Sequence, residues 1–138
     1  MAFKIYQTDD GRVPSIEYLP AGTITPKVGM ALTQSSGKLV IATGTTAPTY
    51  ISMCERETAC TDGEVIPVLR VLPDMVFETT FSASASSVKL GDKVTLHASS
   101  GLEVTATTTS GVAEVVYMDG TTSGSMCRVR FAGQAASV

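Results

Sequence analysis

Residues 35–43 read SSGKLVIAT and residues 99–107 read SSGLEVTAT, so a Ser-Ser-Gly turn followed by a strand-like run occurs twice in the chain. The similarity extends upstream, where residues 27–29 (KVG) correspond to residues 89–91 (KLG). Because Gly and Ser accept turn conformations and the following Val and Thr favour strands, each stretch predicts a turn and a strand. The same local structure is therefore encoded twice.

Weaker matches follow downstream of both copies. Residues 50–53 (YISM) resemble residues 115–118 (VVYM), and residues 69–71 (LRV) resemble residues 129–131 (VRF). Two copies are too few for a solenoid, which needs about three repeats to bury a continuous core. We therefore predict one fold built from two duplicated half-units, which span about residues 22–72 and 83–132.

Apolar residues within the copies recur with a period of two. In the last predicted strand, Cys127, Val129 and Phe131 alternate with Arg128 and Arg130. This pattern is typical of an antiparallel strand with one buried and one solvated face. The sequence thus predicts an all-β fold, either a small antiparallel β-barrel or a β-sandwich, and leaves the choice between them open.

Turn signals support the same fold. Ser36-Gly37 and Ser100-Gly101 predict two equivalent hairpin turns. Pro67 cannot donate a backbone hydrogen bond, so its strand is expected at an edge of the sheet or with a bulge. The small residues of 82–87 (SASASS) predict a linker between the two copies.

The composition argues against several classes of partner. The chain is 43% hydrophobic with a net charge of −3, and its ten Lys and Arg residues are scattered, which disfavours nucleic-acid binding. No apolar run is long enough for a signal peptide or a membrane span, so we expect synthesis in the cytoplasm and no membrane partner.

Residues suited to catalysis or metal binding are scarce. His97 is the single histidine, and no Gly-x-Ser-x-Gly elbow is present, so we predict no enzymatic activity. Cys54, Cys60 and Cys127 form an odd set and are expected to be free thiols. Together with His97 they could formally supply four zinc ligands, but without a CxxC pair we predict neither a metal nor a cofactor.

The N-terminal segment, residues 1–20, lies outside the predicted repeat, and residues 21–138 form the expected β domain. The arm has two interpretations, because exposed apolar side chains mark partner contacts but the arm could equally pack on its own domain. Its large apolar side chains are the candidate partner-binding residues. These are Phe3, Ile5, Tyr6, Ile16, Tyr18 and Leu19.

Several of these stretches resemble a known family. Residues 25–51, 64–81 and 111–120, which include TPKVGMAL, EVIPVLRV and GVAEVVYMDG, resemble head decoration proteins of tailed bacteriophages, also called capsid cement or head fibre proteins. The resemblance implies a β-rich structural protein that binds the outer surface of an assembled phage head and stabilises it. It implies no catalytic residues.

The resemblance also implies partners and a location. The expected partner is the major capsid protein, the expected location is the capsid surface of the virion, and a homo-oligomer is expected, with a trimer favoured. A second hypothesis is a carbohydrate- or receptor-binding β module of a phage fibre or tail. The absence of Trp and the low aromatic content, 6%, disfavour that alternative, because sugars stack on aromatic rings.

Overall fold

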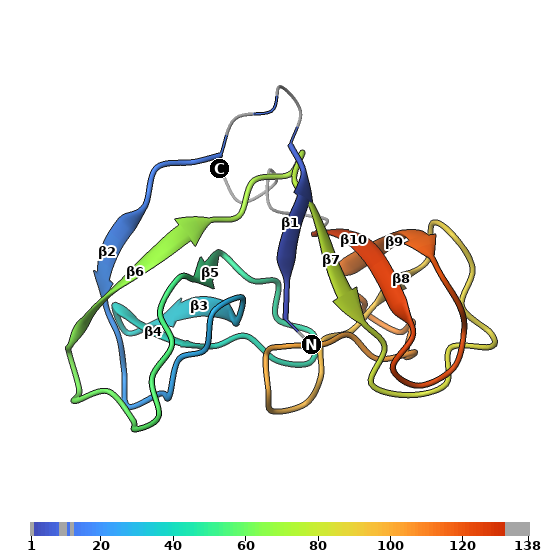
Figure 1. Cartoon of the computed structure of the whole chain (residues 1–138). Coiled ribbons are helices and arrows are strands. Elements are labelled where there is room, and N and C mark those ends of the chain that lie inside the picture. The colour runs from blue at the N-terminus through green and yellow to red at the C-terminus, as the bar shows by residue number, and fades with distance from the viewer. Residues whose placement is uncertain (1, 9–10, 12, 132–138) are drawn as a thin grey trace.

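The computed structural model describes residues 2–8, 11 and 13–131, and Figure 1 shows their strands in two groups. One five-stranded sheet has the order β1-β7-β10-β9-β8, and the other has the order β2-β6-β5-β3-β4. All pairings between neighbouring strands are antiparallel. The strands are β1 (Lys4–Gln7), β2 (Glu17–Pro20), β3 (Ala31–Ser35), β4 (Lys38–Ile41), β5 (Tyr50–Ser52), β6 (Val65–Arg70), β7 (Val76–Thr80), β8 (Lys93–Val94), β9 (Ala113–Met118) and β10 (Met126–Phe131).

The all-β prediction is confirmed. Neither sheet closes on itself into a barrel, so the sandwich-like alternative fits the observed architecture. The described part of the chain also contains no helix with the length and apolar character that a membrane crossing requires.

The duplication is visible in the backbone hydrogen bonds. The first unit contains β2 to β6 and the second contains β7 to β10, with β3, β5 and β6 in the same relative order as β8, β9 and β10. Each unit also repeats the same bonds between its turns and strands. The matched N–H to C=O pairs are Met30–Lys27 with Asp92–Lys89, Gly29–Ser52 with Gly91–Val115, Thr49–Leu32 with Val112–Val94, Ala21–Glu64 with Phe81–Ser125, and Gly63–Ala21 with Gly124–Phe81.

These bonds correct the register of the downstream matches. Ser52 is equivalent to Val115, and Val68, opposite Glu17, is equivalent to Val129, opposite Phe77. The sequence match had placed Leu69 with Val129. Val68 and Leu69 are both buried in β6, so apolar alternation could not distinguish the two registers.

The structure adds one strand to the start of each predicted copy. Residues 17–20 pair with β6 and belong to the first unit, so the arm of residues 1–20 does not lie wholly outside the repeat. Likewise β7 opens the second unit, and residues 71–75 join the units. Residues 82–87 are therefore not the linker, and Ala85 is fully buried. The sequences of β2 (EYLP) and β7 (VFETT) differ, which hid their equivalence.

The N-terminal strand connects the two units. β1 pairs with β7 in the sheet of the second unit, whereas the Phe3 N–H donates to the Gly29 carbonyl of the first unit at 2.9 Å. The Phe3 ring is buried and lies edge-on to Phe131, with the ring centroids 5.2 Å apart. β1 therefore packs on the protein's own core.

The two sheets share part of their core. The larger apolar cluster combines Phe77, Phe81 and Phe131 of the second unit with Ala31 and Ile51 of the first. Two backbone bonds also cross between the units, from the Ala31 N–H to Gly101 O at 2.7 Å and from the Leu96 N–H to Gly44 O at 2.9 Å. The units are therefore packed against each other and not merely tethered.

The two Ser-Ser-Gly turns have different roles. Ser36 and Gly37 form a two-residue hairpin between β3 and β4, with φ of 51° and 79°, as expected for a type I′ turn. Gly101, with φ of 66°, lies in a longer turn, because the antiparallel bonds that flank it run from the His97 N–H to Glu103 O and from the Thr105 N–H to Thr95 O, each at 2.9 Å. Its Cα faces Ile41 and the Ala31 carbonyl of the other unit. Both turns therefore connect antiparallel segments, as predicted, but they are not equivalent, since only the first is a two-residue hairpin.

The prediction for Pro67 is wrong, because β6 lies between β2 and β5. The backbone N and C=O of one strand residue point to the same side, and the Pro67 carbonyl accepts from the Met53 N–H at 3.0 Å. Met53 follows directly after the last residue of β5. The Pro67 nitrogen, which carries no hydrogen, therefore points to the end of the β5–β6 pairing. The absent hydrogen bond costs little stability there.

Candidate interaction surface

An exposed apolar surface lies on the outer side of β2 and β6. Strand alternation directs Leu19 and its partner Ile66 inward and leaves Tyr18 and its partner Pro67 facing outward. Tyr18 is 67% exposed, Val65 at the start of β6 is 56% exposed, and Ile16 directly before β2 is 49% exposed. We call the four residues Ile16, Tyr18, Val65 and Pro67 the β2–β6 face.

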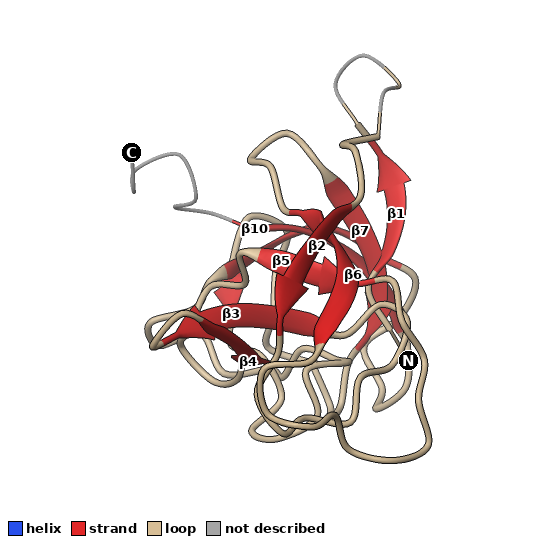
Figure 2. Cartoon of the chain, turned by 90° about the vertical axis from the view of Figure 1, so that its left-hand side faces the viewer, coloured by secondary structure: helices blue, strands red, loops and turns tan. Residues whose placement is uncertain are grey.

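The β2–β6 face lies at the rim of the molecule. β2 is the terminal strand of its sheet, and Figure 1 shows it at the left-hand margin of the molecule, with β6 beside it in both Figure 1 and Figure 2. Beyond the strand, Ala21 forms a parallel bridge to Leu39, so the edge is covered only at that end. An edge strand with exposed aromatic and branched side chains is an accessible site for another chain.

A salt bridge fixes the inner border of this face. Arg70 donates from Nε and Nη2 to the two carboxylate oxygens of Glu17, each at 3.0 Å, and its guanidinium lies 5.1 Å from the centroid of the Tyr50 ring. The hydrogen bonds to Glu17 raise the pKa of Arg70. The bidentate pair ties β2 to β6 and holds the edge strand in place.

The structure separates the six candidate residues of the N-terminal arm. Phe3 is buried, and Ile5 and Leu19 pack against the apolar clusters. Tyr6, Ile16 and Tyr18 remain exposed. The buried side chains of the arm therefore pack on the domain, and Ile16 and Tyr18 on the exposed face of β2 stay candidates for a partner contact.

Val65 and Pro67 were missed as surface residues. The signal was present in the sequence, because Ile66 and Val68 alternate with Val65 and Pro67. If Ile66 and Val68 face the core, the other two must face outward. The presence of four apolar residues in succession concealed this alternation.

Tyr6 belongs to a separate aromatic cluster on the other sheet. The Arg128 guanidinium lies between two rings, 3.7 Å from the centroid of Tyr6 and 4.5 Å from that of Tyr117. Its Nε also donates to Glu78 at 3.0 Å. This stack joins β1, β7, β10 and β9, so its evident role is to attach β1 to the sheet.

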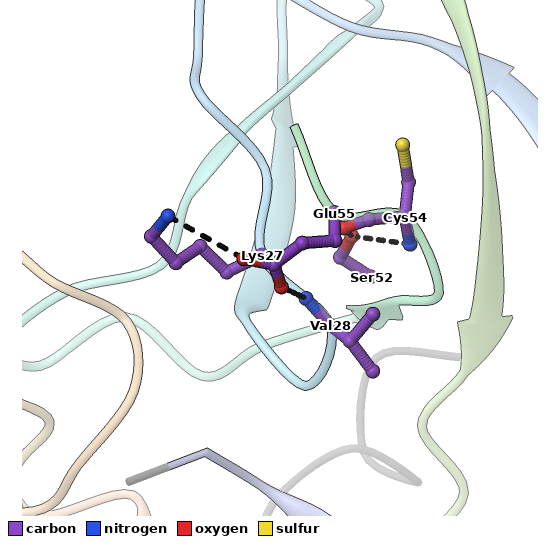
Figure 3. Close-up of polar contacts among 5 residues, drawn as sticks. All are labelled: Lys27, Val28, Ser52, Cys54 and Glu55. Atoms are coloured by element: carbon purple, nitrogen blue, oxygen red, sulfur yellow. Dashed lines mark hydrogen bonds and ion pairs between the residues drawn. The ribbon is translucent and has the colours of Figure 1, made fainter. Parts of the chain in front are cut away.

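The polar cluster around Glu55 connects two loops (Figure 3). The Glu55 carboxylate accepts from the Val28 N–H at 3.0 Å and lies 3.5 Å from Lys27 Nζ, and the bond from Val28 lowers the pKa of Glu55. Ser52 Oγ is engaged with the Cys54 backbone, and Figure 3 shows the Cys54 sulfur pointing away from Glu55. The cluster anchors the turn before β3.

The titratable residues singled out from the sequence are not assembled into a centre. His97 Nδ1 accepts from the Ser99 and Ser100 N–H groups, each at 3.2 Å, and so holds a loop. All three cysteines are free, as predicted. Over residues 2–8, 11 and 13–131, no group of three His, Cys, Asp or Glu side chains is placed to hold a metal ion.

The cysteines are expected to differ in reactivity, because the thiolate is the reactive form. Burial raises the pKa of Cys60 and raises that of Cys127 to about 12, whereas Cys54 is only half-buried. At pH 8 the thiolate fraction of Cys127 is on the order of 10⁻⁴. Timed alkylation with iodoacetamide and peptide mass mapping should label Cys54 first and leave Cys127 unmodified. Labelling in guanidinium should reach all three, and equal native rates at Cys54 and Cys127 would contradict this assignment.

No family model matches the chain, and no curated protein sequence matches it. Functional inference therefore depends on the residues themselves, and above all on the β2–β6 face.

Proposed function

We propose that this protein is a structural virion component, a capsid decoration or cement protein that binds the outer surface of an assembled phage head through its β2–β6 face. The observation that carries the proposal is the exposed edge itself, where Ile16 and Tyr18 at the terminal strand β2 and Val65 on the neighbouring β6 leave large apolar side chains in solvent. Exposed apolar surface of this kind is typical of protein–protein contacts.

The resemblance of residues 25–51, 64–81 and 111–120 to decoration proteins supports the same function. Aromatic residues such as Tyr18 often dominate binding energy, because their rings bury a large area at a small loss of side-chain freedom. The partner in this proposal is the major capsid protein, and the protein acts at the surface of the virion as a homo-oligomer, with a trimer favoured.

Physical chemistry supplies a mechanism for this role. A ligand that binds the assembled shell better than its free subunits stabilises the shell by mass action. Each contact can be modest, because the head lattice presents the same site many times and an oligomer engages several sites together. No chemical step is required of the decoration protein.

Binding to undecorated, expanded heads tests the proposal. The wild-type protein should co-sediment with the heads, and the double variant Tyr18→Ser/Val65→Ser should bind about 10- to 100-fold more weakly, as expected for the loss of interface anchors. Leu90→Ser is the matched control, because Leu90 is 63% exposed in a turn of the second unit and outside the β2–β6 face. This control should bind like the wild type.

Failure of the wild-type protein to co-sediment at any concentration would refute the proposed function. If it instead showed saturable binding on a glycan array, the fibre or tail module would be the better assignment. Equal weakening by Leu90→Ser and by the double variant would move the contact away from the β2–β6 face.

A further inference from the structure

The internal duplication allows the two sheet edges to be compared position by position. The bonds from Ala21 to Glu64 and from Phe81 to Ser125 align the ends of β2 and β7, and the pairings of both strands continue this alignment. Ile16 is thus equivalent to Val76, and Tyr18 to Glu78. The two strands occupy the same place in their units, each beside the last strand of that unit.

The neighbours of these two strands differ. β7 lies between β10 and β1, with Glu78 opposite Lys4 and Phe77 opposite Ile5. β2 has β6 on one side, and on the other side the described residues place only β4 near its end, where Ala21 bridges to Leu39. Exposure follows this difference, since Val76 is 6% exposed and its counterpart Ile16 is 49% exposed. The position that β1 fills in the second unit has an open counterpart in the first.

We propose that the β2 edge accepts an extended segment of the shell protein as an additional antiparallel strand, in the position that β1 occupies beside β7. This inference rests on the proposed function for the identity of the partner and specifies how the contact forms. The bridge from Ala21 to Leu39 limits the open edge to about residues 16–19. β1 has a similar length, Lys4–Gln7.

The backbone of β2 presents suitable groups. The N–H and C=O of Ala21 point toward the β6 side, where they bond to Glu64 and Gly63. Because backbone groups alternate along a strand, those of Tyr18 point to the open edge. Its counterpart Glu78 directs the same groups toward Lys4 of β1. An added strand would gain main-chain bonds at Tyr18 and would present apolar side chains to Tyr18 and Ile16.

The donor is a different protein and not a second copy of this chain. Each chain has one β1, and that strand is already committed, since Phe3 is buried against Phe131 and Ile5 packs on the same cluster. Transfer of β1 to the β2 edge of another copy would uncover Phe77 and Phe131. β1 of a second copy is therefore not the donor, and the proposal assigns the added strand to the shell protein.

Two substitutions at one position separate the main-chain contribution from the side-chain contribution. Tyr18→Ala removes the side chain, whereas Tyr18→Pro also removes the N–H that faces the open edge. Proline is tolerated on an edge strand at such a position, so both free proteins should melt at similar temperatures. In co-sedimentation with undecorated heads, Tyr18→Pro should bind about five- to tenfold more weakly than Tyr18→Ala, the effect of one hydrogen bond.

Hydrogen exchange gives a second readout. The amides of Ile16 and Tyr18, which face the open edge, should become protected when the wild-type protein binds undecorated heads, whereas the amides of β4 should not change. Equal head binding by the two Tyr18 variants, or no new protection, would overturn the strand proposal while wild-type binding kept the proposed function intact. No binding by the wild-type protein would defeat both. A dimer of the free protein that Tyr18→Pro dissociates would assign the edge to a second copy and also overturn the proposal.

Discussion

Replacement of Phe3 by alanine is expected to release β1 from the sheet of the second unit. The side chain is buried against Phe131, and loss of a buried Phe costs about 3–5 kcal/mol in protein cores. Chemical denaturation should show this loss, and hydrogen exchange should show faster exchange in β7, because β1 is its outer neighbour. If β1 detaches before the rest of the protein unfolds, the measured decrease in the free energy of unfolding will equal the free energy needed to detach β1.

Tyr6→Ala is the matched control for Phe3→Ala, since both residues are aromatic and belong to the same N-terminal segment. Tyr6 is exposed and contacts Arg128 across its ring, a contact worth about 0.5–1 kcal/mol at exposed sites. Tyr6→Ala should therefore lower the free energy of unfolding much less than Phe3→Ala does. Identical stability of Phe3→Ala and the wild-type protein would show that β1 does not anchor the second unit.

The second large effect is expected at Gly101, where the two units meet. A Cβ added there would lie 2.7 Å from Ile41 Cγ2 and 3.0 Å from the Ala31 carbonyl oxygen, and φ is +66°. The positive φ alone costs about 1–2 kcal/mol for an L residue. We expect Gly101→Ala to lower the free energy of unfolding by about 1–3 kcal/mol beyond that amount, because the neighbours are a backbone carbonyl and the half-buried Ile41 side chain.

Gly37→Ala provides the comparison within the duplicated Ser-Ser-Gly motif. Its φ is +79°, yet a Cβ there would meet no atom within 4 Å. Both variants therefore carry the backbone strain, and only Gly101→Ala disturbs the contact between the units. Thermal unfolding measured side by side should give a clearly lower Tm for Gly101→Ala. Equal decreases in Tm would mean that the contact between the units does not depend on the close approach of Gly101 to Ile41 and Ala31.

Local patterns predicted the strand content correctly. Alternation at Cys127, Val129 and Phe131 placed these side chains in the core, and Ser36-Gly37 specified a hairpin by its backbone preferences. Such features depend on residues that are close in the sequence, so they can be recognised without knowledge of the remainder. The duplication was recognised for the same reason, because the turn at Lys27-Val28-Gly29 recurs at Lys89-Leu90-Gly91.

Other features depended on contacts between distant segments. The sequences of β2 (EYLP) and β7 (VFETT) gave no sign that the two strands are equivalent. Nor did they show that β1 pairs with the outer edge of β7 and leaves that of β2 open. The sequence also did not separate Phe3, which is buried, from Tyr18, which is exposed. Both are large apolar residues of the N-terminal segment, and only the neighbours across the sheet distinguish them.

The sequence by itself determined an all-β chain with a duplicated unit, since turn preference and period-two alternation are properties of short segments. Only the tertiary structure decided where each strand lies, which Ser-Ser-Gly turn supports the contact between units, and which edge remains open. Strand order and exposure depend on pairings between residues far apart in the chain, such as Lys4 with Glu78, and many pairings satisfy the same local pattern. The proposed binding surface therefore emerges from the arrangement of the strands and from no single motif.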